Sequence, residues 1–416
     1  MKLNTGIGLY LSNSSNKKLI IEQLMFNLFL KGIVDLSSMN GALHSTITIN
    51  KFVEEELRHD RFVITTDENS SLESMSSGQQ KKALLLHLIA RKPDYLVLDD
   101  VYSHIDKETQ QSITAILGQL SDTTLLIQIF FRKRDMLPCI GKVISVDENN
   151  KIVNEQEAVT FQIPEQSHEL NLNRFKLPKE YNELHTDINP LVQLNSVSAK
   201  YLDKKVLDKL SWTIKKGEFW QLTGPNGSGK STLLSLITGD NPRGYGQDMI
   251  LFGKKKGSGE TIWDIKRQIG YFTPSMIQQF TRDDSVENMI ISGLMDSVGL
   301  YCKPTDIQKN IAKSWIEILG PSYKNKSFQN LSIGQQRMVL VARAIVKHPP
   351  LLILDEPTIE LDDENSSIFI EMINILASEK KIAIIYVSHR DEPDLRPDKI
   401  FELIPTGDGH TGIVRK

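Results

Sequence analysis

The feature that most constrains the fold is an internal repeat. The sequence LSIGQQRMVLVARAIVKHPPLLILDEP at 331–357 aligns without a gap with MSSGQQKKALLLHLIARKPDYLVLDDV at 75–101. One offset of 256 residues relates the central glycines, Gly78 and Gly334. Each copy places a helix-like run before an apolar, strand-like run that ends in an acidic residue. The repeat therefore predicts two copies of one α/β domain rather than two unrelated folds.

The two copies differ in length and are separated by a linker. Between 154 and 189 the sequence is polar, loses its periodicity and is interrupted by prolines, which is typical of a linker. We therefore expect a first domain over 1–153 and a second over 190–416. The glycine-rich loop of the second domain has a weaker echo around Lys17, at an offset of 213 residues, so the first domain is 43 residues shorter between these points. It is a reduced copy.

A glycine-rich loop opens the first helix-like run of the second domain. The strand-like run 219–222 leads into GPNGSGKST, and the apolar run LLSLI follows, which is the strand–turn–helix setting of a phosphate loop. Glycines let successive backbone N–H groups point at phosphate oxygens, and the helix adds the positive end of its dipole. We expect Lys230 to reach the β- and γ-phosphates and the Ser231 hydroxyl to bind Mg²⁺. The residues predicted to contact the nucleotide here are Gly224, Pro225, Asn226, Gly227, Ser228, Gly229, Lys230, Ser231 and Thr232.

An acidic pair follows the strand-like run 351–354. Ligands of open α/β sheets bind at the carboxyl ends of strands, so Asp355 and Glu356 are expected beside the phosphate loop. Asp355 is placed to hold Mg²⁺ through water, together with Ser231, and Glu356 to polarise the attacking water. The expected chemistry is hydrolysis of a nucleotide bound with Mg²⁺.

Further motifs accompany the loop and the acidic pair. The sequence LSIGQ at 331–335 precedes the acidic pair by about twenty residues, and TIELD at 358–362 follows it. The order of these motifs resembles that of the ATP-binding-cassette (ABC) ATPases, in which they are the signature and the D-loop. The resemblance implies that Tyr201 stacks on adenine, that His389 senses the γ-phosphate, and that ATP and Mg²⁺ are bound.

The resemblance also implies the fold class. It is α/β, with two P-loop NTPase (ABC-type) nucleotide-binding domains. A mainly parallel, doubly wound sheet is expected, with a helical subdomain and a small antiparallel sheet. One motif departs from the family pattern, because Pro274 stands where a glutamine is usual, and Gln278 and Gln279 lie beyond it. The Q-loop, which normally couples the nucleotide to a partner domain, is therefore altered.

In this family two cassettes pair head to tail, and each ATP lies between the phosphate loop of one and the signature of the other. A tandem chain can form this pair internally. The first composite site would join the motifs of the second domain to the signature of the first, and all its parts are acceptable. The residues that the first domain would contribute are Ser76, Ser77, Gly78 and Gln79.

The second composite site is impaired. It would join Ser332, Gly334 and Gln335 to the first domain, where the loop at 11–18 has no glycine. Bulkier residues do not readily adopt the positive φ angles of a phosphate loop. The aligned positions also change, with Lys18 for the Mg²⁺-binding hydroxyl, Asp100 for the catalytic glutamate and Lys133 for the switch histidine. We expect one hydrolytic site and one degenerate site that binds ATP weakly or not at all.

Composition removes several branches of the family. A formal net charge of −3 and a pI near 6.3 do not supply the basic face that dominates nucleic-acid binding, so no nucleic-acid partner is expected. The two cysteines, Cys139 and Cys302, cannot hold an iron–sulfur cluster. Within the family, the sequences IKRQIGY at 265–271, LSIGQQRMVLVARAIVKHPPLLILDEP at 331–357 and VSHR at 387–390 resemble those of the ModF-like tandem proteins of the molybdate-transport or photorepair type.

The sequence indicates the partner protein and the cellular location less directly than it indicates the fold. No apolar run approaches the ~18–20 residues that span a bilayer. The N-terminus is a poor secretory signal, which favours a cytosolic protein, with a mitochondrial location as the alternative because no acidic residue precedes Glu22. Two kinds of partner fit: a separate membrane permease that the ATPase powers, or a soluble protein whose binding it switches. The altered Q-loop weakens the first.

Overall fold

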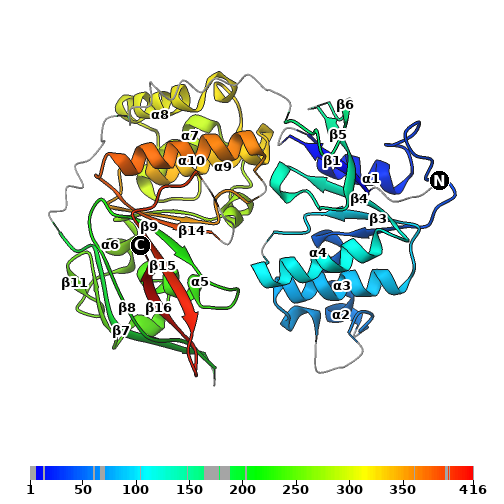
Figure 1. Ribbon diagram of the computed structural model, residues 1–416. Coiled ribbons are helices and arrows are strands. Elements are labelled where there is room, and N and C mark those ends of the chain that lie inside the picture. The colour runs from blue at the N-terminus through cyan, green and yellow to red at the C-terminus, as the bar shows by residue number, and fades with distance from the viewer. Residues whose placement is uncertain are drawn as a thin grey trace. The chain divides into compact units, whose positions relative to one another are not determined.

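The computed structural model describes residues 6–12, 15–59, 61–65, 71–103, 105–147, 149–163, 178, 188–201, 204–359, 361–388, 392 and 394–415. The chain divides into two compact units (Figure 1). The N-terminal unit comprises Met1–Ser167 with Glu360–Glu364, and the C-terminal unit comprises His168–Ile359 with Asn365–Lys416. No helix within these described ranges is long and apolar enough to cross a membrane.

The N-terminal unit is built on a six-stranded sheet with the order β2-β3-β4-β1-β5-β6. Only β6 runs antiparallel to its neighbour. The strands are β1 (Gly6–Leu11), β2 (Gly41–His44), β3 (Tyr95–Asp99), β4 (Leu125–Phe130), β5 (Ile140–Val146) and β6 (Ile152–Glu157), and the helices are α1 (Lys17–Met25), α2 (Thr46–His59), α3 (Ser77–Ala90) and α4 (Lys107–Leu120). The expected linker start at residue 154 falls inside β6, because the pairing of β6 with β5 continues to Glu157.

Helices cover both faces of this sheet (Figure 1). Leu96 and Leu98 of β3 belong to a buried cluster with residues of α2, α3 and α4. Val97, between them, belongs to a second cluster with residues of α1. Successive side chains of a strand point to opposite faces, so a continuous apolar run is what a parallel strand buried on both sides requires.

The C-terminal unit holds a ten-stranded sheet with the order β11-β10-β7-β8-β16-β15-β9-β14-β13-β12. The strands β15, β9, β14, β13 and β12 are mutually parallel, and β7, β8, β10 and β11 form an antiparallel part. The strands are β7 (Val192–Tyr201), β8 (Lys204–Ile214), β9 (Phe219–Thr223), β10 (Asp248–Leu251), β11 (Lys254–Lys255), β12 (Ile269–Phe272), β13 (Leu351–Asp355), β14 (Ala383–Val387), β15 (Lys399–Pro405) and β16 (His410–Arg415). The helices are α5 (Lys230–Ile237), α6 (Ile262–Lys266), α7 (Val286–Ser292), α8 (Asp306–Leu319), α9 (Ile333–Ile345) and α10 (Asp363–Ser378), of which α7 packs against α8 and α9 as a helical subdomain.

The two sheets share one plan. The order β2-β3-β4-β1-β5-β6 is repeated as β12-β13-β14-β9-β15-β16, each with its last strand antiparallel. The expected fold class, two P-loop cassettes with a mainly parallel sheet, is confirmed. In the described part of the N-terminal unit no strand corresponds to β7, β8, β10 or β11, which accounts for much of its smaller size.

Candidate active site

The phosphate loop and the acidic pair meet at one edge of the C-terminal sheet. The strands β9, β14 and β13 are parallel neighbours, and Leu222 pairs with Val387, which pairs with Asp355. The carboxyl ends of the three strands therefore lie next to one another at one edge of the sheet. The chain places Gly224 after β9 and Glu356 after β13, so residues 132 positions apart in the sequence reach the same edge.

The loop requires its glycines. Gly224, Gly227 and Gly229 have φ angles of 148°, 76° and 95°, in the region that L-residues with side chains rarely adopt. A Cβ on Gly224 would lie 2.9 Å from the Cβ of Leu403, and a Cβ on Gly229 would lie 2.8 Å from the side chain of Leu207. The glycines thus let the loop pack closely on the sheet.

Lys230 lies at the start of α5 with its ammonium group held by the loop. Its Nζ donates to the carbonyl oxygens of Gly224 and Pro225, both at 2.8 Å. Ser228 is fully buried, and its Oγ has no hydrogen-bond partner among the described residues. A cation and a buried hydroxyl at the N-terminus of a helix fit a phosphate chain. Among the other predicted contacts, Pro225, Gly227 and Ser231 are exposed, while Asn226 and Thr232 are half-buried.

Asp355 and Glu356 are half-buried at the end of β13. Glu356 has a φ of +49°, and its backbone N–H donates to the carbonyl of Val387 at 3.0 Å. Such backbone strain in a residue with a side chain is concentrated at functional sites. Burial, and next to it the Asp355 carboxylate, raise the pKa of Tyr271 on the adjacent strand β12. The Asp355 carboxylate and the Ser231 hydroxyl are hard oxygen donors of the kind that Mg²⁺ prefers.

Tyr201 is anchored to the helix that follows the phosphate loop. Its hydroxyl accepts a hydrogen bond from Asn241 at 2.9 Å, and the same amide donates to Ser235 of α5 at 3.0 Å. The guanidinium carbon of Arg243 lies 3.8 Å from the centre of the tyrosine ring. The ring, 36% exposed, is held in place as a stacking surface for a base would need to be. Arg243 and Asn241 carry no sequence signal for this contact.

Both signature segments begin a helix in the same way. Ser76 caps α3 and forms a capping box with Gln79, and Ser332 caps α9 with Gln335. The S-x-x-Q spacing explains both caps. Ser76 and Gln79 are exposed, Ser77 is half-buried, and Gly78 is buried. A Cβ on Gly78 would lie 3.1 Å from Thr109, so the glycine also serves the packing of α3 on α4.

The other predicted residues are His389, the D-loop residue Thr358 and Lys133 of the N-terminal unit. His389 lies outside the described residues, so its expected role stays a prediction. In the D-loop, Thr358 donates to the Glu392 carboxylate at 2.7 Å and accepts from Tyr386 at 3.3 Å. In the N-terminal unit, Lys133 donates to the carbonyl of Phe161 at 2.5 Å, so its ammonium group is engaged there.

The altered Q-loop lines a hollow. Pro274 begins the 3₁₀ helix η5 (Pro274–Gln279). Met276 and Gln279 line a hollow of about 260 Å³ within the C-terminal unit, together with Tyr271 of β12 and the exposed Trp263 of α6. The segment that stands in place of the usual glutamine therefore lies beside a concave surface. This surface also includes Tyr271, on the strand next to the one that ends in Asp355.

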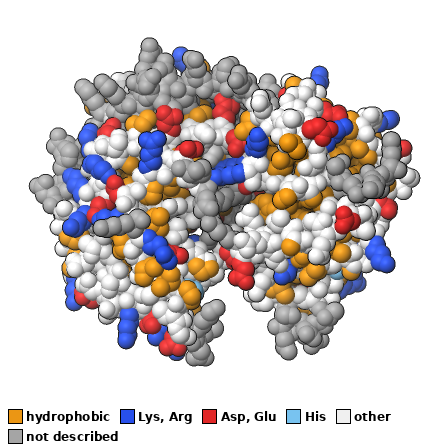
Figure 2. Space-filling view, viewed as in Figure 1, with side chains coloured by type: hydrophobic (Ala, Val, Ile, Leu, Met, Phe, Trp, Pro, Cys, Tyr) orange, Lys and Arg blue, Asp and Glu red, His pale blue; other side chains and the backbone are white. Residues whose placement is uncertain are grey.

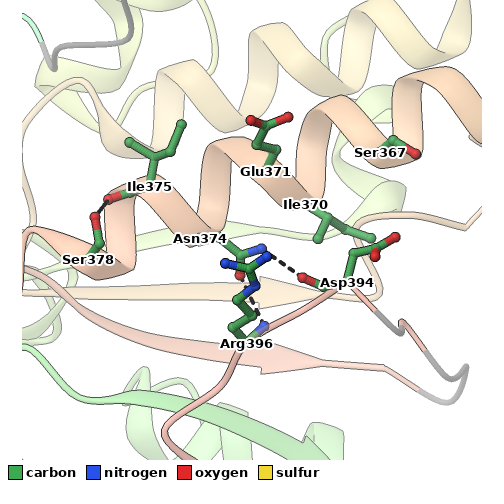
Figure 3. A pocket seen from close by; sticks show the side chains of 8 residues that line it. All are labelled: Ser367, Ile370, Glu371, Asn374, Ile375, Ser378, Asp394 and Arg396. Atoms are coloured by element: carbon green, nitrogen blue, oxygen red, sulfur yellow. Dashed lines mark hydrogen bonds between the residues drawn. The ribbon is translucent and has the colours of Figure 1, made fainter. Parts of the chain in front are cut away.

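A larger hollow of about 460 Å³ lies elsewhere in the C-terminal unit, along α10 (Figure 3). Asp394 and Arg396 line it opposite residues of the helix. The Asn374 amide donates to the carbonyl of Asp394 at 2.8 Å and accepts from the backbone N–H of Arg396 at 3.0 Å. Neither a glycine loop nor a strand-end acidic pair lines this hollow. The larger hollow therefore lacks the features that fit a phosphate chain at the ends of β9 and β13.

Known proteins share these features. Residues 207–359 match the family model described as ABC transporter. The ABC transporter ATP-binding protein ModF of Escherichia coli is 35% identical over 371 residues, which cover 86% of this chain and 75% of that protein. An uncharacterized ABC transporter ATP-binding protein of Schizosaccharomyces pombe is 30% identical, covering 78% of this chain and 66% of its own length.

A solved structure resembles the whole chain. The crystal structure of an archaeal ribosome recycling factor in complex with a ribosomal stalk protein covers 98% of this chain and 85% of its own, with a TM-score of 0.62. At 14% identity, this similarity concerns the fold alone.

Proposed function

The chain belongs to the family of ATP-binding-cassette (ABC) ATPases, and we propose that it hydrolyses MgATP at one competent site, built on the C-terminal unit. The observation that carries the proposal is the parallel register of β9, β14 and β13, which brings the loop at 224–231 and the pair Asp355–Glu356 to one sheet edge. The N-terminal unit repeats the strands but not the glycines.

In this proposal the loop binds the phosphates and the strand ends act on them. Backbone N–H groups of 226–231 and the first turn of α5 stabilise negative charge, and Lys230 leaves the carbonyl oxygens of Gly224 and Pro225 for phosphate oxygens. Ser231 and Asp355 would hold Mg²⁺, which would neutralise charge that develops on the phosphates. Glu356 orients the attacking water and accepts its proton. Tyr201 stacks on the adenine.

We further propose that the signature of the N-terminal unit, Ser76–Gln79, completes this site. Ser77 and Ile333 occupy the same position of the two capped helices, which makes them a matched pair for a test. Ser77→Arg places a long side chain at the first turn of α3, where we propose that the γ-phosphate docks. We expect a loss of turnover of roughly 10-fold or more, since a misplaced catalytic element costs about this much. Steady-state ATPase assays measure it.

The control is Ile333→Arg. Ile333 is 50% exposed at the start of α9, and we propose that the site it would complete is degenerate. Turnover should stay within about 2-fold of the wild type. Equal losses in the two variants would contradict the pairing of the C-terminal loop with the N-terminal signature.

We also propose that hydrolysis drives a partner protein, and that the partner is a membrane permease. The E. coli relative is named a transporter ATP-binding protein, which supports this choice. Pro274 in the altered Q-loop favours the second candidate, a soluble partner whose binding is switched by ATP. Lys and Arg side chains are interspersed with Asp and Glu on the face in Figure 2, without the continuous basic stripe that a nucleic acid would need.

Co-purification separates the two partners. We expect a stoichiometric membrane protein to accompany the chain from detergent-solubilised membranes and to be lost without detergent. Recovery of a water-soluble protein instead, retained only by the ATP-bound Glu356→Gln variant, would contradict the permease and support the switch.

A further inference from the structure

The phosphate-loop lysine of the N-terminal unit is paired with that unit's own strand-end aspartate. Lys17 corresponds to Lys230, and Asp99 corresponds to Asp355. The Nζ of Lys17 lies 3.1 Å from Oδ1 of Asp99. The Asp99 side chain is only 5% exposed and that of Lys17 is 26% exposed, so the pair is largely withdrawn from water.

In the C-terminal unit, the corresponding lysine donates to two carbonyl oxygens of its own loop. In the N-terminal unit the lysine would have to leave a buried carboxylate. A buried charge that loses its partner is strongly destabilising, and this cost opposes the binding of a phosphate.

The neighbouring acidic residue is also engaged. Asp100 has a φ of +56°, close to that of Glu356 at the aligned position. Its carboxylate accepts a hydrogen bond from the Ser103 hydroxyl and lies 3.7 Å from the Nζ of Lys81. Lys81 is 3% exposed and also donates to the carbonyls of Asp100 at 2.5 Å and Ser103 at 2.8 Å. This carboxylate is held by the chain itself.

We propose that the N-terminal unit carries a built-in cation site, in which the Lys17 ammonium takes the position that Mg²⁺ and nucleotide would require at Asp99. The inference rests on the proposed function, because it gives the physical reason for a single competent site. Lys17 then stabilises the N-terminal unit and does not bind ATP. Lys81 serves Asp100 in the same manner, so both acidic residues at the strand end are neutralised by the chain.

The test compares the melting temperatures of single and double variants of the full chain. Lys17→Met should lower the melting temperature by about 4 °C or more, because Asp99 stays buried without its ion pair. Lys18→Met removes the same charge from the next, exposed residue and should change it by less than about 1 °C. Adding Asp99→Asn to Lys17→Met should restore at least half of the decrease in melting temperature.

Nucleotide stoichiometry supplies a second readout. Calorimetric titration with a non-hydrolysable MgATP analogue should give about one site per chain for the wild type and for Lys17→Met. Two sites in the wild type that fall to one in Lys17→Met would overturn the inference. So would equal melting temperatures of Lys17→Met and Lys18→Met.

Two further outcomes are decisive. If Lys17→Met alone fails to fold, folding of the double variant with Asp99→Asn supports the ion pair, and its failure to fold beside a folded Asp99→Asn contradicts it. The proposed function fails differently, through a Lys230→Ala variant that still hydrolyses ATP. That result would leave the comparison of melting temperatures unchanged.

Discussion

Replacing Lys230 by alanine should abolish measurable MgATP hydrolysis, with a loss of at least about 100-fold. The loss of one preorganised charge that stabilises a developing anion costs this much or more. The ammonium group of Lys230 is the charge that the loop holds 2.8 Å from two of its carbonyls. The substitution leaves the loop glycines and their packing on the sheet unchanged, so the loop should keep its fold. Steady-state phosphate release measures the effect, and circular dichroism checks the fold.

The aligned variant Lys17→Ala is the matched control. Lys17 is paired with Asp99, so its loss should weaken the N-terminal unit while turnover stays within about 3-fold at temperatures below unfolding. Loss of turnover in folded Lys17→Ala would show that both sites contribute to hydrolysis, and the asymmetry of the two units would then be wrong.

Much of the fold and of the loop could be predicted because the responsible signals are local. The glycines at 224, 227 and 229 adopt the positive φ angles that their residue type permits, and the S-x-x-Q spacing forms the expected cap in both signature helices. The repeat likewise predicted that the two sheets follow one plan. For the loop and the two caps, a short stretch of sequence contains the whole physical cause.

The contacts that distinguish the two units are not local. Lys17 and Asp99 are 82 positions apart in the sequence, and only the parallel packing of β1, β4 and β3 brings the start of α1 near the end of β3. The stacking of Arg243 on Tyr201 depends in the same way on how the chain leaves α5. The sequence indicated that the N-terminal loop is degenerate. The ion pair between Lys17 and Asp99, however, could be found only from the structure.

Glu356→Gln should separate binding from hydrolysis. Gln cannot accept the proton of the attacking water, and loss of a general base costs about 10²- to 10⁴-fold in rate. The substitution keeps the shape of the side chain and leaves the backbone N–H that donates to Val387 at 3.0 Å in place. We therefore expect turnover to fall by at least about 100-fold while the affinity for MgATP is kept. Filter binding of labelled ATP beside phosphate release measures both quantities.

The aligned substitution Asp100→Asn shows whether the loss of turnover is specific to the acidic residue that follows β13. Asp100 shares the positive φ of Glu356, yet its carboxylate is held by Ser103 and Lys81, so it is not placed to accept a proton from water. Turnover should stay within about 3-fold of the wild type. A loss in Asp100→Asn as large as in Glu356→Gln, with the fold intact, would place a second catalytic carboxylate in the N-terminal unit. Because the two residues share their backbone geometry, a difference between the variants must arise from the length of each side chain and from what surrounds each carboxylate.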